Sequence, residues 1–332
     1  MSKQDPALSR TRRVLSALAV AGAVIGAGGA AAQAAPSSDD GPSRHEVSAQ
    51  AASAADDYWT ASRMENAVPA DGLLAEGHQA STPKTPEASP TRIDGTTAQP
   101  EARSAVSDAA PGEVQPQSEQ PVDHIGKIFF TLGGTDYVCS GNAVVSQNES
   151  TVATAGHCAN EGPGDWATNW VFVPAYEDGA APLGKWTAES LYAPTEWTQQ
   201  GDITYDTAFA VVGTQSGQTL TDVVGASGVS FDENTGLTYT SYGYPAAAPF
   251  DGQSLESCHG AASPDPTGGT KSQGIPCDMT GGSSGGPWFV GSGSSGYQNS
   301  VNSFGYNNIA DTMFGPYWGD VIKQSYDEAQ SV

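Results

Sequence analysis

The stretch Gly281-Gly282-Ser283-Ser284-Gly285-Gly286-Pro287 says most about the fold of this 332-residue chain. Two adjacent serines lie among four glycines, so the backbone can turn tightly there and bring a hydroxyl close to peptide N–H groups. A serine hydroxyl is a weak nucleophile, and it needs an adjacent base that a third group holds in the right tautomer. A histidine and a carboxylate are therefore expected elsewhere in the sequence.

Two upstream segments offer these groups. Thr154-Ala155-Gly156-His157-Cys158 supplies a histidine, and Asp206-Thr207-Ala208-Phe209-Ala210 supplies an aspartate that leads into an apolar run. Asp202 is a rival for the second role, but only Asp206 directly precedes the expected buried strand. The sequence therefore predicts that His157, Asp206 and Ser284 act together.

The order of these residues separates two folds. The string Gly282-Ser283-Ser284-Gly285-Gly286 also fits the G-x-S-x-G elbow of α/β-hydrolases, in which the histidine follows the serine. None of the five histidines lies after Ser284, so that topology is excluded; they are His45, His78, His124, His157 and His259. The order His, Asp, Ser is that of chymotrypsin-type enzymes.

At these three segments the chain resembles the chymotrypsin-like (trypsin-fold) serine endopeptidases, above all their secreted bacterial members, including the glutamyl-endopeptidase-like group. The resemblance covers about residues 124–328. It implies an all-β fold of two antiparallel six-stranded barrels, about 122–213 and 214–316, with the active site in the cleft between them. It also implies a C-terminal helix, about 317–329, that packs on the second barrel.

The same resemblance implies a role for each matching residue. His157 is the general base, Asp206 orients it, Ser284 is the nucleophile, and the N–H groups of Gly282 and Ser284 form the oxyanion hole. Ser283 departs from the family's digestive members, which carry an aspartate there that pairs with a new N-terminus after activation. A serine cannot form that ion pair, so a different activation mechanism is expected.

Substrate-binding residues are also implied. Ser303-Phe304-Gly305 resembles the family's segment that pairs with the substrate as an added strand. Asp278 lies six residues before Ser284, where trypsin-like members keep the carboxylate that receives Lys or Arg. Cleavage after basic residues is therefore expected, with Glu or an apolar residue as alternatives; His259 is interpreted as a loop histidine.

Four cysteines point to disulfides. An even number in an exported chain favours two bridges, and sequence alone leaves three pairings open. The family's histidine-loop bridge implies Cys139–Cys158, which leaves Cys258–Cys277. No CxxC or HxxxH spacing accompanies the cysteines, so no metal is expected, and nothing points to a cofactor.

The N-terminal third differs in composition from the rest. A basic start, an apolar run from Val14 to about Ala31 and the small-x-small site Ala32-Gln33-Ala34 predict a signal peptide at 1–34 and hence secretion. Residues 35–121 are rich in Ala, Ser, Pro, Thr and Gln, which predicts a disordered propeptide. Within it, Tyr58-Trp59 and the residues that follow resemble a short motif of secreted actinobacterial-type peptidase prosegments.

The expected catalytic domain, 122–332, is strongly acidic. It carries 22 Asp and Glu against four Lys and no Arg, a net charge of about −18. This charge argues against nucleic acid or an anionic membrane as a partner. We expect a monomer that acts on protein or peptide substrates, with a non-catalytic binding protein on the same fold as the alternative.

Short β-rich runs with turns between them support an all-β domain. The expected strands are Lys127–Leu132, Tyr137–Val145, Thr151–Ala155, Trp170–Pro174, Thr207–Val212, Leu237–Tyr244, Pro287–Val290 and Ser300–Tyr306. Only Tyr317–Ala329 has apolar residues at helical spacing, so one C-terminal helix is expected.

Overall fold

The structure is a computed structural model, and it describes residues 41–74, 89–97, 116–267 and 270–332. The predicted signal peptide at 1–34 lies outside the described residues. Among the residues that are described, no helix is both long and apolar enough to cross a membrane.

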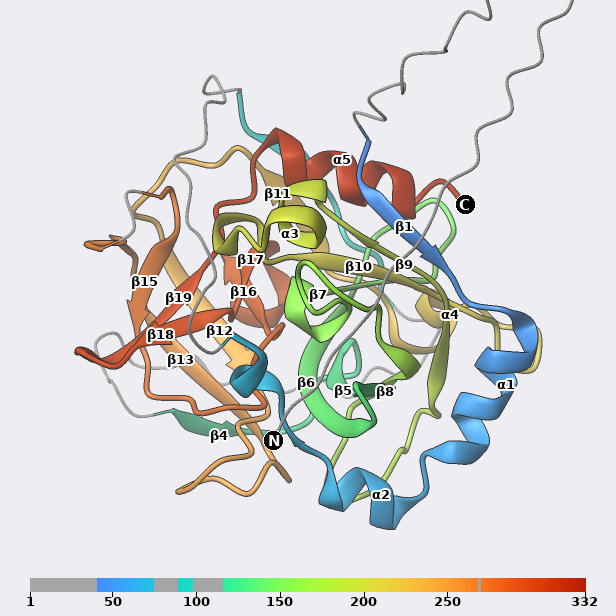
Figure 1. The fold of residues 1–332 in the computed structure, drawn as a ribbon. Coiled ribbons are helices and arrows are strands. Elements are labelled where there is room, and N and C mark those ends of the chain that lie inside the picture. Colours follow the sequence, from blue (N-terminus) through green and yellow to red (C-terminus); the bar gives the residue numbers. More distant parts are fainter. Residues whose placement is uncertain (1–40, 75–88, 98–115, 268–269) are drawn as a thin grey trace, which may run out of the picture. The chain divides into compact units, whose positions relative to one another are not determined.

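The first half of the domain is a closed six-stranded barrel (Figure 1). Its strands are β5 (Ile125–Leu132), β6 (Thr135–Val144), β7 (Thr151–Thr154), β8 (Thr168–Pro174), β9 (Trp186–Ala193) and β10 (Ala208–Val212). They pair antiparallel in the order β9-β10-β7-β6-β5-β8, and β8 pairs with β9 to close the ring. This half confirms the predicted first barrel.

Strand β5 consists mostly of apolar residues, and its surroundings explain this composition. Its Ile128 and Phe130 belong to the barrel's core cluster, whereas Phe129 points to the other side. There Phe129 joins a second buried cluster with Tyr242 and Phe289 from the second half of the chain. Both faces are therefore buried, and the strand reads as an almost continuous apolar run rather than an alternating one.

The second half consists of two sheets. The strands after Val224 are β11 (Gly228–Phe231), β12 (Thr238–Gly243), β13 (Leu255–Ala261), β14 (Ser263–Pro264), β15 (Gln273–Pro276), β16 (Pro287–Val290), β17 (Tyr297–Val301), β18 (Phe304–Tyr306) and β19 (Ile309–Gly315). One sheet has the order β3-β11-β17-β16-β12-β13-β4 and the other β14-β15-β19-β18, where β3 is Thr91–Ile93 and β4 is Gln117–Glu119. The fold is thus mostly β with one closed barrel and further sheets. A second closed six-stranded barrel stays a prediction.

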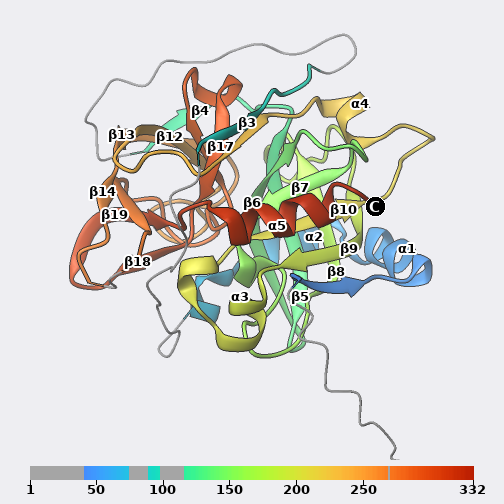
Figure 2. The same cartoon turned by 90° about the horizontal axis from the view of Figure 1, so that it is seen from above.

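Short helices connect the strands. They are η2 (Gly156–Cys158), α3 (Thr195–Gln200), η3 (Ile203–Tyr205), α4 (Leu220–Val224), η4 (Gly293–Ser295) and α5 (Asp320–Ala329). The predicted C-terminal helix is present as α5. It lies against β9 and β10 of the first barrel (Figure 2), and its Tyr326 also packs on Phe231 of β11 in the second half, with ring centroids 5.3 Å apart. Tyr326 explains this position: its ring packs on Phe209 of β10, and its hydroxyl donates to the carbonyl of Val145 at 2.7 Å.

The expected disorder of residues 35–121 is corrected by the structure for much of this segment. Residues 41–74 contain β1 (Ser43–Glu46), α1 (Ala49–Tyr58), α2 (Ala61–Asn66), β2 (Val68–Pro69) and η1 (Ala70–Leu74), and β3 and β4 follow further on. The side chains of Ser48 and Thr60 cap the two α-helices by accepting hydrogen bonds from Ala51 and Arg63 N–H.

These N-terminal elements use the barrel as their core. Trp59 is 1% exposed; its ring packs on Phe129, and its Nε1 donates to the carbonyl of Asn169. Strand β1 pairs with β9, and β3 pairs with β11. A segment that is too polar to form a core of its own is therefore ordered by docking, which a composition rule does not capture.

Lys127 in β5 makes stability depend on pH. It is 2% exposed, donates to the carbonyl of Gly252 at 2.8 Å and lies 4.3 Å from the centre of the Tyr176 ring. Burial lowers its pKa to about 7 from the ordinary 10.5, although Asp251 opposes the change. Between these two values the unfolded chain binds more protons than the folded one, so stability should rise with pH.

We expect the free energy of unfolding to rise relative to a Lys127→Met variant by up to about 5 kcal/mol across this window, since one pKa unit corresponds to about 1.4 kcal/mol. Urea unfolding of both proteins at several pH values between 6 and 10, on a Ser284→Ala background that removes the predicted nucleophile, measures this. Parallel pH profiles for the two proteins would show that Lys127 stays charged in the folded state.

Candidate active site

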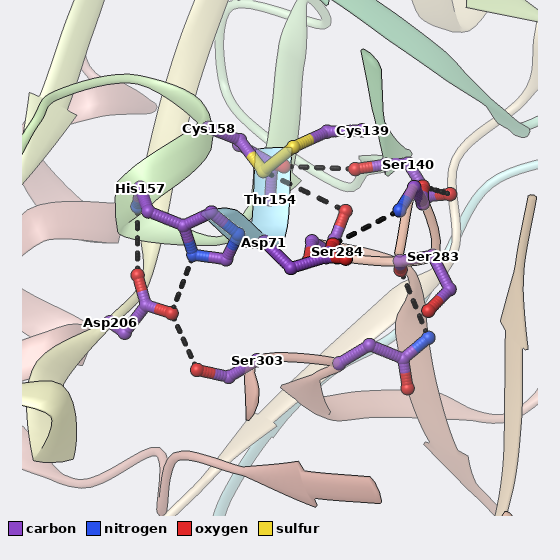
Figure 3. The surroundings of a disulfide bond; sticks show 12 residues. Asp71, Cys139, Ser140, Thr154, His157, Cys158, Asp206, Ser283, Ser284 and Ser303 are labelled. Atoms are coloured by element: carbon purple, nitrogen blue, oxygen red, sulfur yellow. Dashed lines mark hydrogen bonds and ion pairs between the residues drawn. A yellow bond between two sulfur atoms is a disulfide. The ribbon is translucent and has the colours of Figure 1, made fainter. Parts of the chain in front are cut away.

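His157 and Asp206 meet because of strand pairing. Strands β7 and β10 are antiparallel neighbours, with Ala208 opposite Thr154. Residues just after β7 and just before β10 therefore lie at the same end of the barrel, and these are η2 with His157 and the loop with Asp206. His157 Nδ1 lies 2.8 Å from Asp206 Oδ2, and the backbone N–H of His157 donates to Asp206 Oδ1 at 2.8 Å. The predicted pair is brought together as a buried unit (Figure 3).

Three donors keep the Asp206 carboxyl ionised. Burial alone would raise its pKa, but the charge and hydrogen bonds of His157, together with the Ser303 hydroxyl, outweigh burial and hold the pKa below its usual value. Ser303 Oγ donates to Asp206 Oδ2 at 2.5 Å. The carboxylate is therefore available to orient the imidazole throughout the neutral range.

The turn that carries Ser284 requires glycine at two positions. Gly282 has φ +97° and Gly285 has φ +82°, conformations that residues with a Cβ rarely adopt. A Cβ at Gly285 would also lie 2.1 Å from Thr154 Oγ1 in β7. The turn therefore packs directly against β7 of the first barrel. This contact places Ser284 next to the segment that carries His157.

Two polar residues that sequence reasoning missed hold this turn. Ser140 in β6 donates its N–H to the carbonyl of Ser284 at 2.7 Å and its hydroxyl to the carbonyl of Gly282 at 2.9 Å. Asn302, fully buried, donates from Nδ2 to the carbonyl of Ser283 at 3.1 Å. Its backbone exchanges hydrogen bonds with the turn, accepting from Gly285 N–H and donating to the Gly286 carbonyl. In the sequence, the only indication of this role for Asn302 is its position directly before Ser303-Phe304-Gly305.

These contacts explain how the turn is built with Ser283 in place of an aspartate. The Ser283 hydroxyl donates to the carbonyl of Thr280 at 2.8 Å, within the same turn. Ser140 and Asn302 hold the backbone from both sides. The turn is therefore ordered in the full-length chain without an ion pair to a new N-terminus.

Asp71, a residue without any sequence motif, also lies in the site. Its Oδ1 accepts from the Gly282 N–H at 3.1 Å and from the Ser284 hydroxyl at 3.3 Å (Figure 3). His157 Nε2 is buried and has no hydrogen-bond partner among the described residues. Asp71 thus contacts the predicted nucleophile and one of the two predicted oxyanion donors.

The predicted substrate-binding residues have different surroundings. Ser303 is buried against Asp206, so its side chain positions the carboxylate. Phe304 and Gly305 lie in β18, an edge strand of the four-stranded sheet, as an added strand requires. Asp278 is half-buried, and its Oδ1 is buried without a hydrogen-bond partner among the described residues. Burial raises the pKa of the Asp278 carboxyl, a backbone N–H opposes this, and Asp311 adds to it.

Both predicted disulfides are confirmed, Cys139–Cys158 and Cys258–Cys277. The first joins β6 to the residue that follows His157. The sulfur atoms of Cys139 and Cys158 lie near His157, but both are consumed by the bridge and offer no thiolate to a metal. The interpretation of His259 as a loop histidine is corrected: it lies in strand β13, opposite Thr240 of β12, and its Nδ1 is 3.0 Å from Thr240 Oγ1.

Comparisons with solved structures place the chain among proteases. It is 64% identical to the protease Anisep from Arthrobacter nicotinovorans, with 65% of this chain and 100% of that chain covered and a TM-score of 0.64. It is 52% identical to AL20, a thermostable serine protease from an extremophilic microorganism, with 63% and 98% covered and a TM-score of 0.61. A Glu endopeptidase structure, 20% identical with a TM-score of 0.52 and with 72% and 98% covered, shares the fold.

No protein-family model and no curated protein matches the chain. The two bacterial serine proteases nevertheless align over nearly their whole length at high identity. The chain belongs to the chymotrypsin-fold bacterial serine proteases.

Proposed function

We propose that the protein is a secreted serine endopeptidase in which Ser284, His157 and Asp206 form the catalytic triad. The observation that carries this proposal is the buried Asp206–His157 pair beside the Ser284 turn. With Asp206 accepting the Nδ1 proton, His157 Nε2 is left as the acceptor for the serine proton. Ser284 Oγ then attacks the peptide carbonyl, and its proton moves to Nε2.

The following steps use the same groups. The Gly282 and Ser284 N–H groups stabilise the developing oxyanion, and Asp206 stabilises the imidazolium that forms. His157 returns the proton to the leaving amine, which leaves an acyl group on Ser284. Water, deprotonated by His157, releases the acid product. The substrate would extend along the β18 edge at Phe304 and Gly305.

The mature enzyme would lack the N-terminal third. The Anisep chain is matched over its full length by 65% of this chain, about 216 residues, which is close to the length of 122–332. This supports a zymogen in which residues 35–121 are a propeptide. Mass spectrometry of the secreted protein should find a mature start near 104–124. A mature form that retained Tyr58 and Trp59 would contradict this part of the proposal.

Cleavage after Lys or Arg is supported by Asp278. Its unpartnered buried oxygen and the neighbouring Asp311 favour a cation at this place. An Asp278→Ser variant should lose roughly a hundredfold or more of its turnover after Arg, because removing one partner of a buried charge pair is costly. Hydrolysis after Leu should be retained.

A peptide library cleaved by the processed wild type and by Asp278→Ser measures this. Cleavage after Leu serves as the internal control for folding and for the triad. Unchanged cleavage after Arg in the variant would place Asp278 outside the specificity pocket.

A further inference from the structure

A side-chain carboxylate from a distant part of the chain occupies the site. Asp71 in η1 accepts from Gly282 N–H and from Ser284 Oγ through the same oxygen atom, Oδ1. Gly282 is 211 residues away in sequence, so this is a tertiary contact that the fold of the N-terminal segment creates. Gly282 N–H is a predicted donor to the oxyanion, so a negatively charged oxygen already lies where negative charge would develop during catalysis.

The surface around Ser284 leaves room for this carboxylate. A Cβ placed on Gly281 would lie 1.6 Å from Asp71 Oδ2, and the three nearest heavy atoms to that position all belong to Asp71. The φ of Gly281 is not positive, so its backbone conformation alone does not require a glycine. The space above Gly281 is therefore filled by Asp71, and the glycine is needed for contact with this ligand rather than for the turn.

The contact opposes the proposed chemistry in two ways. The Ser284 hydroxyl donates to Asp71, so its proton is directed away from His157. His157 Nε2 has no hydrogen-bond partner among the residues described. The Gly282 N–H, a predicted oxyanion donor, holds a carboxylate in place of a peptide carbonyl. A carboxylate carbon is a poor electrophile, so Ser284 has no reactive carbonyl to attack.

The neighbouring residues hold Asp71 in place. Strand β2, with Val68 and Pro69, pairs in parallel with Tyr137 and Val138 of β6. Ala70, next to Asp71, is fully buried in the core cluster of the first barrel. Leu73 and Leu74, on the other side of Asp71, pack against the same cluster, so the chain is attached to the core on both sides of the carboxylate.

A second anchor lies further toward the N-terminus. Trp59 is buried on Phe129, and Lys185 donates to the Trp59 carbonyl at 3.1 Å. The hydroxyl of Tyr58 donates to Asp136 at 2.8 Å, and the Arg63 guanidinium bridges to the same carboxylate at 3.1 Å. All of these partners belong to the first half of the domain, so the segment docks as a ligand on the outer surface of the barrel.

We propose that the Gly282 N–H, the Ser284 hydroxyl and the space above Gly281 form a carboxylate-binding site, and that its ligand is Asp71 of the docked segment 43–74. The carboxylate keeps the full-length chain latent until the segment is removed. Because Ser140 and Asn302 already order the nucleophile turn, release of Asp71 suffices for activity, and no new N-terminus has to be inserted. This inference rests on the proposed function.

The test is fluorophosphonate labelling of the full-length chain. Intact and processed forms are separated by size after a short exposure to the probe, so each form is measured in the same sample. We expect the intact wild type to remain almost unlabelled. Intact Asp71→Ala should label roughly 10- to 100-fold faster, the factor that hydrogen bonds to a charged group contribute. Gly281→Ala, which expels the carboxylate from the other side, should give the same direction of change.

Asp57→Ala is the matched control, since Asp57 is an exposed aspartate in the same segment. It should behave like the wild type. If Asp71→Ala converts itself to the mature form too quickly for labelling, the rate at which the intact band disappears should rise relative to the wild type by a similar factor.

The outcomes separate this inference from the proposed function. One outcome would overturn the role of Asp71 but leave the proposed function intact. In it, Asp71→Ala and Gly281→Ala are both labelled and processed at wild-type rates, and the processed form is reactive. An intact wild type that labels as fast as its processed form would overturn latency. A processed form that never labels would instead contradict the proposed endopeptidase.

Discussion

Replacing Ser284 with alanine is expected to lower kcat of the processed enzyme about a million-fold, the effect of removing the nucleophile from a triad that acts as a unit. The fold should be retained, because the backbone atoms of Ser284, including the carbonyl that accepts from Ser140 at 2.7 Å, are unchanged. Hydrolysis of a peptide substrate and thermal unfolding of the same preparation measure the two effects separately.

Ser283→Ala is the matched control for this variant. The Ser283 hydroxyl only donates to the carbonyl of Thr280 within the turn, and the backbone of the turn is held by Ser140 and Asn302. Its activity should stay within about tenfold of the wild type, the factor for one neutral hydrogen bond. A large loss of kcat in Ser283→Ala together with a small loss in Ser284→Ala would show that Ser283 is the nucleophile.

Asp206→Asn should lower kcat about ten-thousand-fold, as the same change does in comparable triads. The carboxylate accepts from His157 Nδ1, from the His157 backbone and from Ser303. The asparagine amide can instead donate to Nδ1, which favours the His157 tautomer with its proton on Nε2. A protonated Nε2 cannot accept the proton of Ser284. Steady-state kinetics at saturating substrate measure this loss as a change in kcat.

Asp202→Asn tests whether the effect belongs to Asp206. The Asp202 side chain accepts from the N–H of Thr204 at 3.0 Å as the cap of η3, and asparagine caps helices about as well. Its kcat should be near that of the wild type. Comparable losses in both variants would mean that a change in local structure, rather than the tautomer of His157, accounts for them.

The site was predictable where chemistry and strand order act together. His157 follows β7 and Asp206 precedes β10. The Thr154–Cys158 string marked the first position in the sequence, and the apolar run after Asp206 marked the second. Ser303 was expected to bind substrate through its backbone, and no motif indicated that its hydroxyl would reach Asp206. Asn302 is one of several polar residues in its stretch of sequence, and only the tertiary contacts with the turn distinguish it from a surface asparagine.

The N-terminal segment shows a different limit. Its low content of large apolar residues correctly excludes an independent core, but Trp59 and the short strands β1, β2 and β3 dock on an existing barrel. The strands β9 and β13 were not expected, because WTAESLYA and LESCHGA carry polar residues that the sheets bury. In both cases the deciding contact is made by a distant part of the chain.

The most direct test of the triad is to locate the fluorophosphonate adduct on the processed wild-type enzyme. Peptide mapping by mass spectrometry should find one probe molecule on Ser284, and His157→Ala should abolish this labelling while the protein remains folded. An adduct on Ser283, or a folded processed protein that takes up no probe, would contradict the account; the second result would indicate a non-catalytic binding protein on a protease fold.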